Sequence, residues 1–262
     1  VVSMLKVTDL KCGYEKTEIV HGVSFTVEDG EFVCIMGANG CGKSTTMKTI
    51  LDILKPFGGT VSLDGEDVFS LNNEQRAKLF AYIPQSHTPP FPFTVADVVL
   101  LGRTPHIGQF ARIHEKDRVI AYQAMQQLSI EGMADKIYSE HSGGQQQLVL
   151  IARALAQQPR VLLMDEPTAS LDFGNQQTVL NRMRKLTHDG MSVLMITHDP
   201  GHAFFCADKV VMMEKGSVLG IGAPADIITE PNLKRIYGHD VCVSEVTLPS
   251  GEKTRVCVPM LV

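Results

Sequence analysis

Apolar and polar residues alternate along residues 4–30. The apolar positions are Leu5, Val7, Leu10, Val20, Val23, Phe25 and Val27, with breaks at 13–15 and 28–30. Alternation with a period of two places one face of each strand against a core and the other face in water. The stretch therefore predicts an antiparallel β-layer at the start of the chain.

Continuous apolar runs follow this layer. Segments 31–36, 161–166 and 192–197 lack the polar alternation, as strands buried on both faces of a parallel sheet do. Apolar residues at helical spacing predict helices at 45–54, 72–79, 174–187 and near 201–206. This rhythm of strands and helices predicts an α/β fold with a parallel sheet.

A helical segment interrupts the α/β pattern. After a strand at 80–85, three prolines lie in a stiff loop, and helices are predicted at about 94–102, 114–128 and 144–157. We therefore expect a single domain whose catalytic core is formed by 1–85 and 159–240, with a helical subdomain inserted at 86–158. Near the end of the chain we expect a turn at 214–216, a short helix near 225–237 and a C-terminal β-hairpin within 241–262.

Composition and charge narrow the function classes. The chain has 262 residues with 44% hydrophobic and 20% charged residues, which is typical of a globular domain. Its net charge is −5 and its lysines and arginines do not cluster, so nucleic acid is not an expected partner. No apolar stretch is long enough to cross a bilayer, and the N-terminal residues resemble neither a signal nor a transit peptide. Six cysteines without a C-x-x-C pair indicate reduced thiols. Cys242 and Cys257 are expected to face each other across a C-terminal hairpin, without forming a disulfide. We therefore expect a cytoplasmic protein.

Residues 37–44 match the phosphate-binding pattern G-x-x-x-x-G-K-[ST], between the strand predicted at 31–36 and the helix predicted at 45–54. Glycines let backbone N–H groups converge on phosphate oxygens, and the helix N-terminus adds a partial positive charge. Lys43 is expected to reach the β- and γ-phosphates, and the Ser44 hydroxyl is expected to ligate Mg²⁺. The expected nucleotide-binding residues here are Gly37, Ala38, Asn39, Gly40, Cys41, Gly42, Lys43, Ser44 and Thr45.

Two residues in this region allow more than one interpretation. Cys41 lies inside the phosphate loop, where a small packing residue is favoured over a redox switch. Tyr14 lies in the turn between the first two predicted strands and is a candidate for stacking on adenine. Without other motifs, Tyr14 would be read as an ordinary surface or core aromatic.

Six stretches in a fixed order resemble the nucleotide-binding subunit of an ATP-binding cassette (ABC) transporter. They are Gly37–Ser44 (Walker A), Gln85 (Q-loop), Ser142–Gln145 (signature), Val161–Glu166 (Walker B), Ser170–Asp172 (D-loop) and Thr197–His198 (switch histidine). The Ser-Gly-Gly-Gln run is the most specific of these, because other P-loop enzymes lack it. The resemblance covers almost the whole chain and implies a P-loop NTPase core that binds ATP and Mg²⁺.

The resemblance implies a catalytic role for Lys43 and for residues after it. Asp165 would hold Mg²⁺ directly or through water, and Glu166 would orient and deprotonate the attacking water. Gln85 would contact the metal and the water and link the core to the helical insertion. His198 would hydrogen-bond the γ-phosphate. Taken by itself, the Asp165-Glu166 pair would be read as a solvated acidic turn.

The signature acts on the other subunit in this family, which implies a head-to-tail homodimer with two sandwiched ATP molecules. The implied ATP contacts made across that dimer are Ser142, Gly143, Gly144, Gln145 and, from the D-loop, Asp172. This chain has His141 where the signature usually starts with leucine. Accommodation by packing is favoured there over a catalytic or pH-sensing effect. His198 and His202 have a zinc-like spacing, but Pro200-Gly201 is expected to break the helix that such a site needs.

Residues 86–108 are similar to the subgroup serving importers of iron-siderophore, haem and cobalamin, and also to molybdate and tungstate importers. The resemblance implies an ATPase subunit that powers uptake of a metal-containing substrate. It also implies two membrane permease subunits that dock near 86–110, an extracytoplasmic substrate-binding protein, and a peripheral location on the cytoplasmic side of the inner membrane. The alternatives are an exporter ATPase subunit and a soluble ABC ATPase of DNA repair or translation.

Overall fold

The computed structural model describes residues 4–85, 92–107, 112–249, 251 and 253–260. The chain divides into two compact units, Val1–Ser70 with Thr187–Val262, and Leu71–Leu186. The helical subdomain predicted at 86–158 lies within the second unit, and its boundaries stay a prediction. No helix in the described ranges has the length and apolar character needed to cross a membrane.

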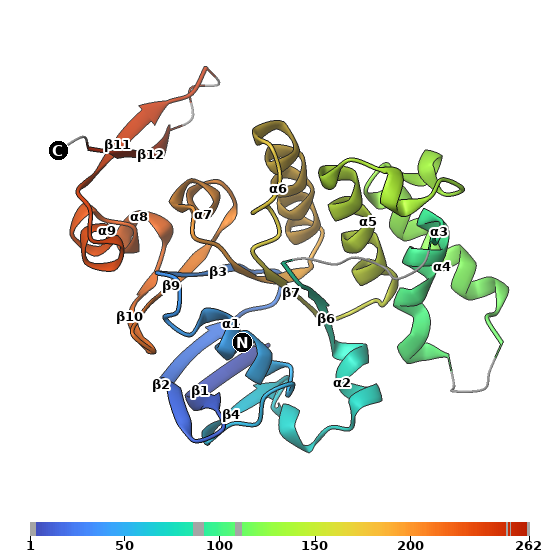
Figure 1. Ribbon diagram of the computed structural model, residues 1–262, viewed down its shortest axis with the longest axis horizontal. Coiled ribbons are helices and arrows are strands. Elements are labelled where there is room, and N and C mark those ends of the chain that lie inside the picture. The colour runs from blue at the N-terminus through green and yellow to red at the C-terminus, as the bar shows by residue number, and fades with distance from the viewer. Residues whose placement is uncertain (1–3, 86–91, 108–111, 250, 252, 261–262) are drawn as a thin grey trace. The chain divides into compact units, whose positions relative to one another are not determined.

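The first unit begins with an antiparallel sheet (Figure 1). It contains β1 (Leu5–Tyr14), β2 (Thr17–Val27), β4 (Gly58–Leu63) and β5 (Glu66–Asp67) in the order β2-β1-β4-β5, and the 3-10 helix η1 (Val68–Ser70) follows. Leu5 lies opposite Val27 on one side and Leu63 on the other, and all three side chains are buried. The predicted antiparallel layer is therefore confirmed, because the alternating apolar residues face one core.

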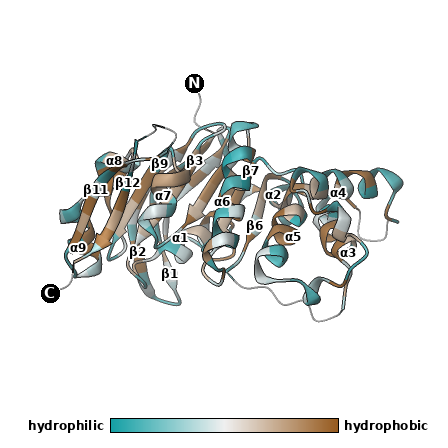
Figure 2. Cartoon of the chain, turned by 90° about the horizontal axis from the view of Figure 1, so that it is seen from above, coloured by the Kyte–Doolittle hydropathy of each residue, from teal (hydrophilic) through white to brown (hydrophobic). Residues whose placement is uncertain are grey.

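The same unit contains parallel strands that carry the phosphate loop. The strands are β3 (Phe32–Gly37), β8 (Ser192–Ile196), β9 (Lys209–Glu214) and β10 (Ser217–Gly222), in the order β10-β9-β3-β8. β3 runs parallel to both β8 and β9, while β10 pairs antiparallel with β9. Every residue of β3 and β8 is buried, and Figure 2 colours much of the sheet around β3 brown. Burial on both faces explains the uninterrupted apolar sequences.

The first helix is shorter than its apolar pattern predicts. Helix α1 (Lys43–Ile50) was expected to continue to residue 54. Asp52 adopts a left-handed backbone conformation with φ of 56°, and its N–H donates to the Thr49 carbonyl at 2.9 Å. The Ile53 N–H donates back to the Lys48 carbonyl at 2.9 Å. This pair of bonds is a Schellman C-cap, which ends the helix although apolar residues continue.

The second unit is mainly helical. Its elements are α2 (Asn73–Leu79), β6 (Phe80–Ile83), α3 (Val95–Leu100), η2 (Leu101–His106), α4 (Glu115–Gln127), η3 (Glu131–Met133), η4 (Tyr138–Glu140), α5 (Gly143–Ala156), β7 (Val161–Asp165) and α6 (Phe173–His188), whose last residues lie in the first unit. β6 and β7 are parallel. The buried Arg103 guanidinium joins α4 to α5, because it donates to Asp117 at 3.1 Å and to the Ala156 carbonyl at 2.7 Å.

The C-terminal part contains α7 (Pro200–Cys206), α8 (Pro224–Ile227), α9 (Glu230–Tyr237), β11 (Val241–Thr247) and β12 (Lys253–Pro259). The single helix predicted near 225–237 is two helices. Thr229 caps the N-terminus of α9 by accepting from the Asn232 N–H, and Pro231 occupies its first turn. A capping residue followed by proline starts a new helix, because the proline nitrogen has no hydrogen to donate to an earlier turn.

The C-terminal hairpin is present as predicted, drawn in red in Figure 1. One expectation about it is wrong. Cys242 lies opposite Val258, and Cys257 lies opposite Val243. Residues one position apart point to opposite faces of a ribbon. The two thiols therefore do not face each other, and both are free.

Candidate functional site

The phosphate loop connects β3 to α1 in the first unit. Gly37 ends β3 with its backbone against the neighbouring strand, and a Cβ there would clash with the carbonyl oxygen of Met213. The Thr46 N–H and hydroxyl both bond the Gly42 carbonyl, at 2.8 and 2.9 Å, which secures the first turn of α1. The loop therefore has the strand, turn and helix N-terminus that the sequence motif requires.

Lys43 is buried and curls over the loop. Its Nζ donates to the carbonyl oxygens of Gly37 at 2.7 Å and Ala38 at 3.0 Å. These two hydrogen bonds hold the end of the side chain at the loop, where a phosphate would bind. The side chain therefore lies where the sequence motif predicts a phosphate contact.

A hairpin turn is hydrogen-bonded to the phosphate loop. The turn connects β9 to β10, and its Gly216 N–H donates to the Cys41 carbonyl at 3.0 Å. The Gly216 carbonyl in turn accepts from the His21 N–H at 2.7 Å. These two bonds tie the phosphate loop to β2 and to the end of β9. A Lys-Gly pair marks the turn in the sequence, but nothing there indicates its contact with the loop.

Cys41 packs as a buried side chain with 7% exposure. Burial raises the pKa of its thiol, although the nearby Lys43 charge opposes the shift. A thiol with a raised pKa is mostly protonated near neutral pH and is a poor nucleophile. The packing interpretation of Cys41 is therefore favoured over the redox one.

Two other candidate residues belong to the first unit. Tyr14 ends β1 and is 44% exposed, so its ring is available for stacking. His198 follows β8 and is also exposed. Tyr237, the last residue of α9, donates its hydroxyl to the His198 carbonyl at 3.0 Å. Sequence reasoning missed Tyr237, because no local pattern connects residues so far apart.

Pro200 and Gly201, which were predicted to break a helix after His198, instead lie at the start of one. Pro200 and Gly201 begin α7, and Asp199 caps the helix by accepting from the Gly201 N–H at 2.7 Å. Burial lowers the pKa of His202, whose Nδ1 lies 3.3 Å from the Thr197 hydroxyl. Among the residues that the structure describes, no group of three His, Cys, Asp or Glu side chains is placed to hold a metal ion.

Three candidate residues of the second unit meet at the end of β7. Asp165 ends this strand with 8% exposure. Its negative charge adds to burial in raising the pKa of Tyr82 to about 12. Glu166 has a left-handed backbone with φ of 48°, and its Oε2 accepts from the Gln85 Nε2 at 3.2 Å. Strained backbone at a non-glycine residue is common at functional sites.

The signature residues form the N-terminus of α5. Ser142 caps the helix: its hydroxyl accepts from the Gln145 N–H, and the Gln145 Oε1 accepts from the Ser142 N–H at 3.2 Å. Gly143 begins the helix and is exposed. This capping box leaves a helix N-terminus open to solvent, where it favours anions.

His141 and Asp172 flank these elements. The His141 Nδ1 lies 3.2 Å from the Gln145 Oε1, while its Nε2 is buried without a hydrogen-bond partner in the described part of the chain. Asp172 accepts from the Asn175 N–H at 2.8 Å and from the Asn175 side chain at 2.9 Å, at the start of α6. Both residues therefore have local structural contacts.

Comparisons with known proteins agree with this geometry. The family model described as ABC transporter matches residues 20–169. An uncharacterized ABC transporter ATP-binding protein of Haemophilus influenzae is 38% identical over 90% of each chain. The hemin import ATP-binding protein HmuV of Rhizobium meliloti is 35% identical, covering 92% of this chain and 94% of the relative. The iron(3+)-hydroxamate import ATP-binding protein FhuC of Bacillus subtilis is 33% identical, covering 96% and 93%.

Solved structures are similar over the same extent. A chain of an ABC transporter assigned to the metal-chelate type, in an inward-facing conformation, has a TM-score of 0.88 and 29% identity. The similarity covers 99% of this chain and 98% of that one. Fold and phosphate loop together define a P-loop nucleoside triphosphatase. The chain belongs to the ABC transporter family and is an ABC ATPase, an enzyme that binds and hydrolyses ATP. The predicted family, fold class and enzyme class are thereby confirmed.

Proposed function

We propose that this ABC ATPase powers an importer of an iron chelate or haem. The observation that carries the proposal is the similarity to the hemin and iron-hydroxamate import ATP-binding proteins over more than 90% of each chain. The metal-chelate type of the similar transporter structure supports the same class of substrate. Cobalamin, molybdate and tungstate belong to the wider class of metal-containing substrates that the sequence suggests.

ATP would bind first through the phosphate loop. Lys43 would exchange its two carbonyl partners for the β- and γ-phosphates, because a phosphate oxygen attracts the ammonium more strongly than a neutral carbonyl does. The backbone of 37–45 and the N-terminus of α1 would provide N–H donors. The exposed ring of Tyr14 would stack on adenine.

Hydrolysis would depend on Glu166 as general base for the attacking water. Its bond with Gln85 supports a role of the glutamine in orienting this carboxylate. His198 would hydrogen-bond the γ-phosphate. Gln85 directly precedes the segment 86–110 that is proposed to contact the permease, so its hydrogen bond with Glu166 would link permease docking to the general base.

The residues proposed to hold Mg²⁺ have oxygen donors of the kind that this ion prefers. The proposed donors are the Ser44 hydroxyl, the Gln85 amide oxygen and the buried Asp165 carboxylate, all of which are the hard oxygen ligands that Mg²⁺ prefers. A donor set with a single carboxylate suits a metal whose remaining ligands are water and substrate phosphates. When bound, Mg²⁺ would neutralise charge on the phosphates.

The proposed active unit is a homodimer. The signature residues Ser142, Gly143 and Gln145 are exposed at the N-terminus of α5, whereas Gly144 is buried. This N-terminus would bind the γ-phosphate of ATP held by a second copy. Asp172 would contribute through the D-loop. ATP would hold the two subunits together, and hydrolysis would release them.

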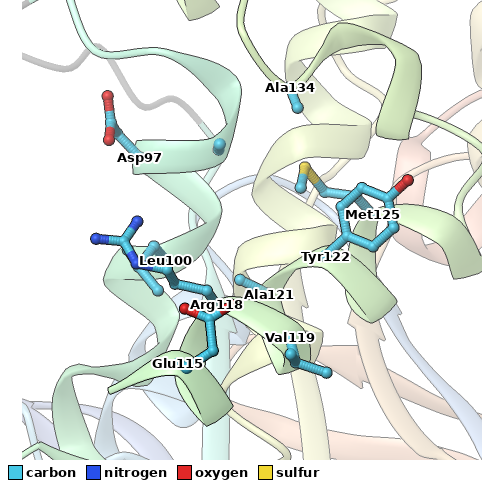
Figure 3. A pocket seen from close by; sticks show the side chains of 10 residues that line it. Asp97, Leu100, Glu115, Arg118, Val119, Ala121, Tyr122, Met125 and Ala134 are labelled. Atoms are coloured by element: carbon cyan, nitrogen blue, oxygen red, sulfur yellow. The ribbon is translucent and has the colours of Figure 1, made fainter. Parts of the chain in front are cut away.

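Two permease subunits would dock on the helical segment near 86–110. The described part of that segment contains α3, which lines a pocket of about 360 Å³ together with α4 (Figure 3). The lining includes Ala96, Asp97, Leu100, Arg118, Tyr122 and Met125. Val119 and Tyr122 are each 46% exposed, so the pocket has an apolar rim that suits a partner helix. Such docking would hold the chain on the cytoplasmic face of the inner membrane, with a substrate-binding protein on the other face.

Transport would be tested in cells that lack the gene for this chain. Uptake of radiolabelled ferric hydroxamate, haemin, cobalamin and molybdate would be compared after complementation with wild type or Lys43→Ala. We expect wild type to restore uptake of ferric hydroxamate or haemin, and Lys43→Ala to restore neither. Restoration of cobalamin or molybdate uptake alone would contradict the assignment to iron chelate or haem. Uptake that is unaffected by loss of the chain would refute the importer role.

A further inference from the structure

We propose that Tyr237 is a positioning residue for ATP hydrolysis, because it fixes the backbone that carries His198. The inference rests on the proposed role of His198 at the γ-phosphate. The contact is the hydrogen bond from the Tyr237 hydroxyl to the His198 carbonyl, with an oxygen-to-oxygen distance of 3.0 Å. It connects the C-terminal helix α9 to the loop after β8.

His198 lies in the short loop between β8 and α7, and the backbone N–H groups of both neighbouring residues are hydrogen-bonded. On one side, the Thr197 N–H donates to the Ile35 carbonyl of β3 at 3.1 Å. On the other, the Asp199 N–H donates to the Thr197 hydroxyl at 3.1 Å, and Asp199 caps α7. The Tyr237 bond holds the peptide that joins residues 198 and 199. Fixing that peptide limits the directions in which the exposed imidazole can point.

Helix α9 is itself held firmly enough to serve as a support. Leu233 is fully buried, and Gly238 ends the helix with its N–H donating to the Lys234 carbonyl at 2.8 Å. The Arg235 guanidinium forms a fork on the Glu214 carboxylate, with N-to-O distances from 2.6 to 3.1 Å. Bidentate pairing of this kind restricts orientation as well as distance.

The same helix also reaches the phosphate loop. Glu214 ends β9 immediately before the turn whose Gly216 N–H bonds the Cys41 carbonyl. Arg235 and Ile236 line a cavity of about 180 Å³ together with residues 38–41 of the loop. One helix therefore contacts both the support of the phosphate loop and the backbone of His198. This arrangement would keep the His198 imidazole at a fixed position relative to the phosphates bound by the loop.

The variant Tyr237→Phe removes the hydroxyl and keeps the ring. Loss of one hydrogen bond that orients a reacting group should lower kcat for ATP hydrolysis by about threefold to tenfold. The KM for ATP should change by less than about twofold, since the hydroxyl does not touch the nucleotide. Lys234→Gln is the matched control on the same helix, because it removes an exposed ion pair with Asp240 of 2.7 Å. We expect wild-type kcat from this control.

A double-mutant cycle in the full chain distinguishes positioning from general damage. If Tyr237 acts through His198, Tyr237→Phe should cause no further loss of kcat in a His198→Ala background. Losses that multiply in the double variant, or wild-type kcat in Tyr237→Phe, would overturn the proposal. Failure of the proposed role of His198 gives a different result, because His198→Ala alone would then hydrolyse ATP with the kcat of wild type.

A second measurement does not require turnover. In protein labelled with ¹³C-histidine, the ring signal of His198 is identified by its disappearance in His198→Ala. Tyr237→Phe should shift this signal, and Lys234→Gln should leave it in place. An unmoved signal in Tyr237→Phe would show that the hydroxyl does not set the environment of the imidazole.

Discussion

Two hairpin turns of the same geometry offer a matched test of how the phosphate loop is supported. Gly216 lies between β9 and β10 with φ of 81°, after Lys215 with φ of 45°. Gly65 lies between β4 and β5 with φ of 86°, after Asp64 with φ of 51°. Both are two-residue turns with positive φ at each central residue, the form that favours glycine at the second position.

The two glycines differ in their surroundings. A Cβ on Gly65 would meet no atom within 4 Å, whereas a Cβ on Gly216 would clash with the Ile19 carbonyl. Gly65→Ala therefore adds only backbone strain, about 1 kcal/mol after the smaller entropy of the unfolded alanine chain is counted. Gly216→Ala must also displace the turn and break its bonds to Cys41 and His21. Two backbone bonds of about 1 kcal/mol each bring the loss to about 3 kcal/mol.

Thermal unfolding and ATP titration measure the difference. The Tm should fall by about 3 °C in Gly65→Ala and by about 9 °C in Gly216→Ala. The Kd for ATP should rise about fivefold in Gly216→Ala only, because the lost bond with Cys41 orders the phosphate loop. Equal Tm losses in the two variants would refute the steric argument. A lowered Tm with unchanged ATP affinity in Gly216→Ala would refute the support of the loop.

Four further predictions concern the site itself. Glu166→Gln should bind ATP, lose about 10²- to 10⁴-fold in kcat as a missing general base does, and elute as a dimer with ATP in light scattering; a monomer at saturating ATP would contradict the sandwich. Lys43→Ala should show no ATP binding by calorimetry, and wild-type affinity would contradict the phosphate contact. His141→Leu should keep the pH profile of hydrolysis and unfold at the same or higher temperature, because it removes a buried nitrogen without a partner among the described residues; a shifted profile would indicate pH sensing. Since burial raises the pKa of Cys41, iodoacetamide at pH 8 should leave it unmodified in folded protein, and mass spectrometry that finds rapid labelling would show the loop to be open.

Local sequence patterns predicted most of the fold. The alternating residues of β1 and β2, the apolar run of β3 and the buried face of α5 each follow from the period of one element and the side it buries. Where the structure differs, a backbone feature outside that periodicity intervened. Asp52 ended α1 with a left-handed cap, and Thr229 with Pro231 divided the predicted helix near 225–237.

The register of the C-terminal hairpin could not be read from composition. Cys242 and Cys257 lie on opposite faces because the pairing places Val258 and Val243 across from them. A shift of one residue in pairing exchanges the faces, and no feature of either strand alone specifies it.

The family could be identified from the sequence because its motifs are local. The phosphate loop 37–44, the signature 142–145 and the pair Asp165-Glu166 are each contiguous, so their residue types and spacing identify the family without a structure. Only the tertiary structure revealed which distant groups support them. Gly216 reaches Cys41, Gln85 reaches Glu166 and Tyr237 reaches His198. Contacts between residues far apart in the chain depend on how whole elements pack, and a single sequence has no periodic signal for them.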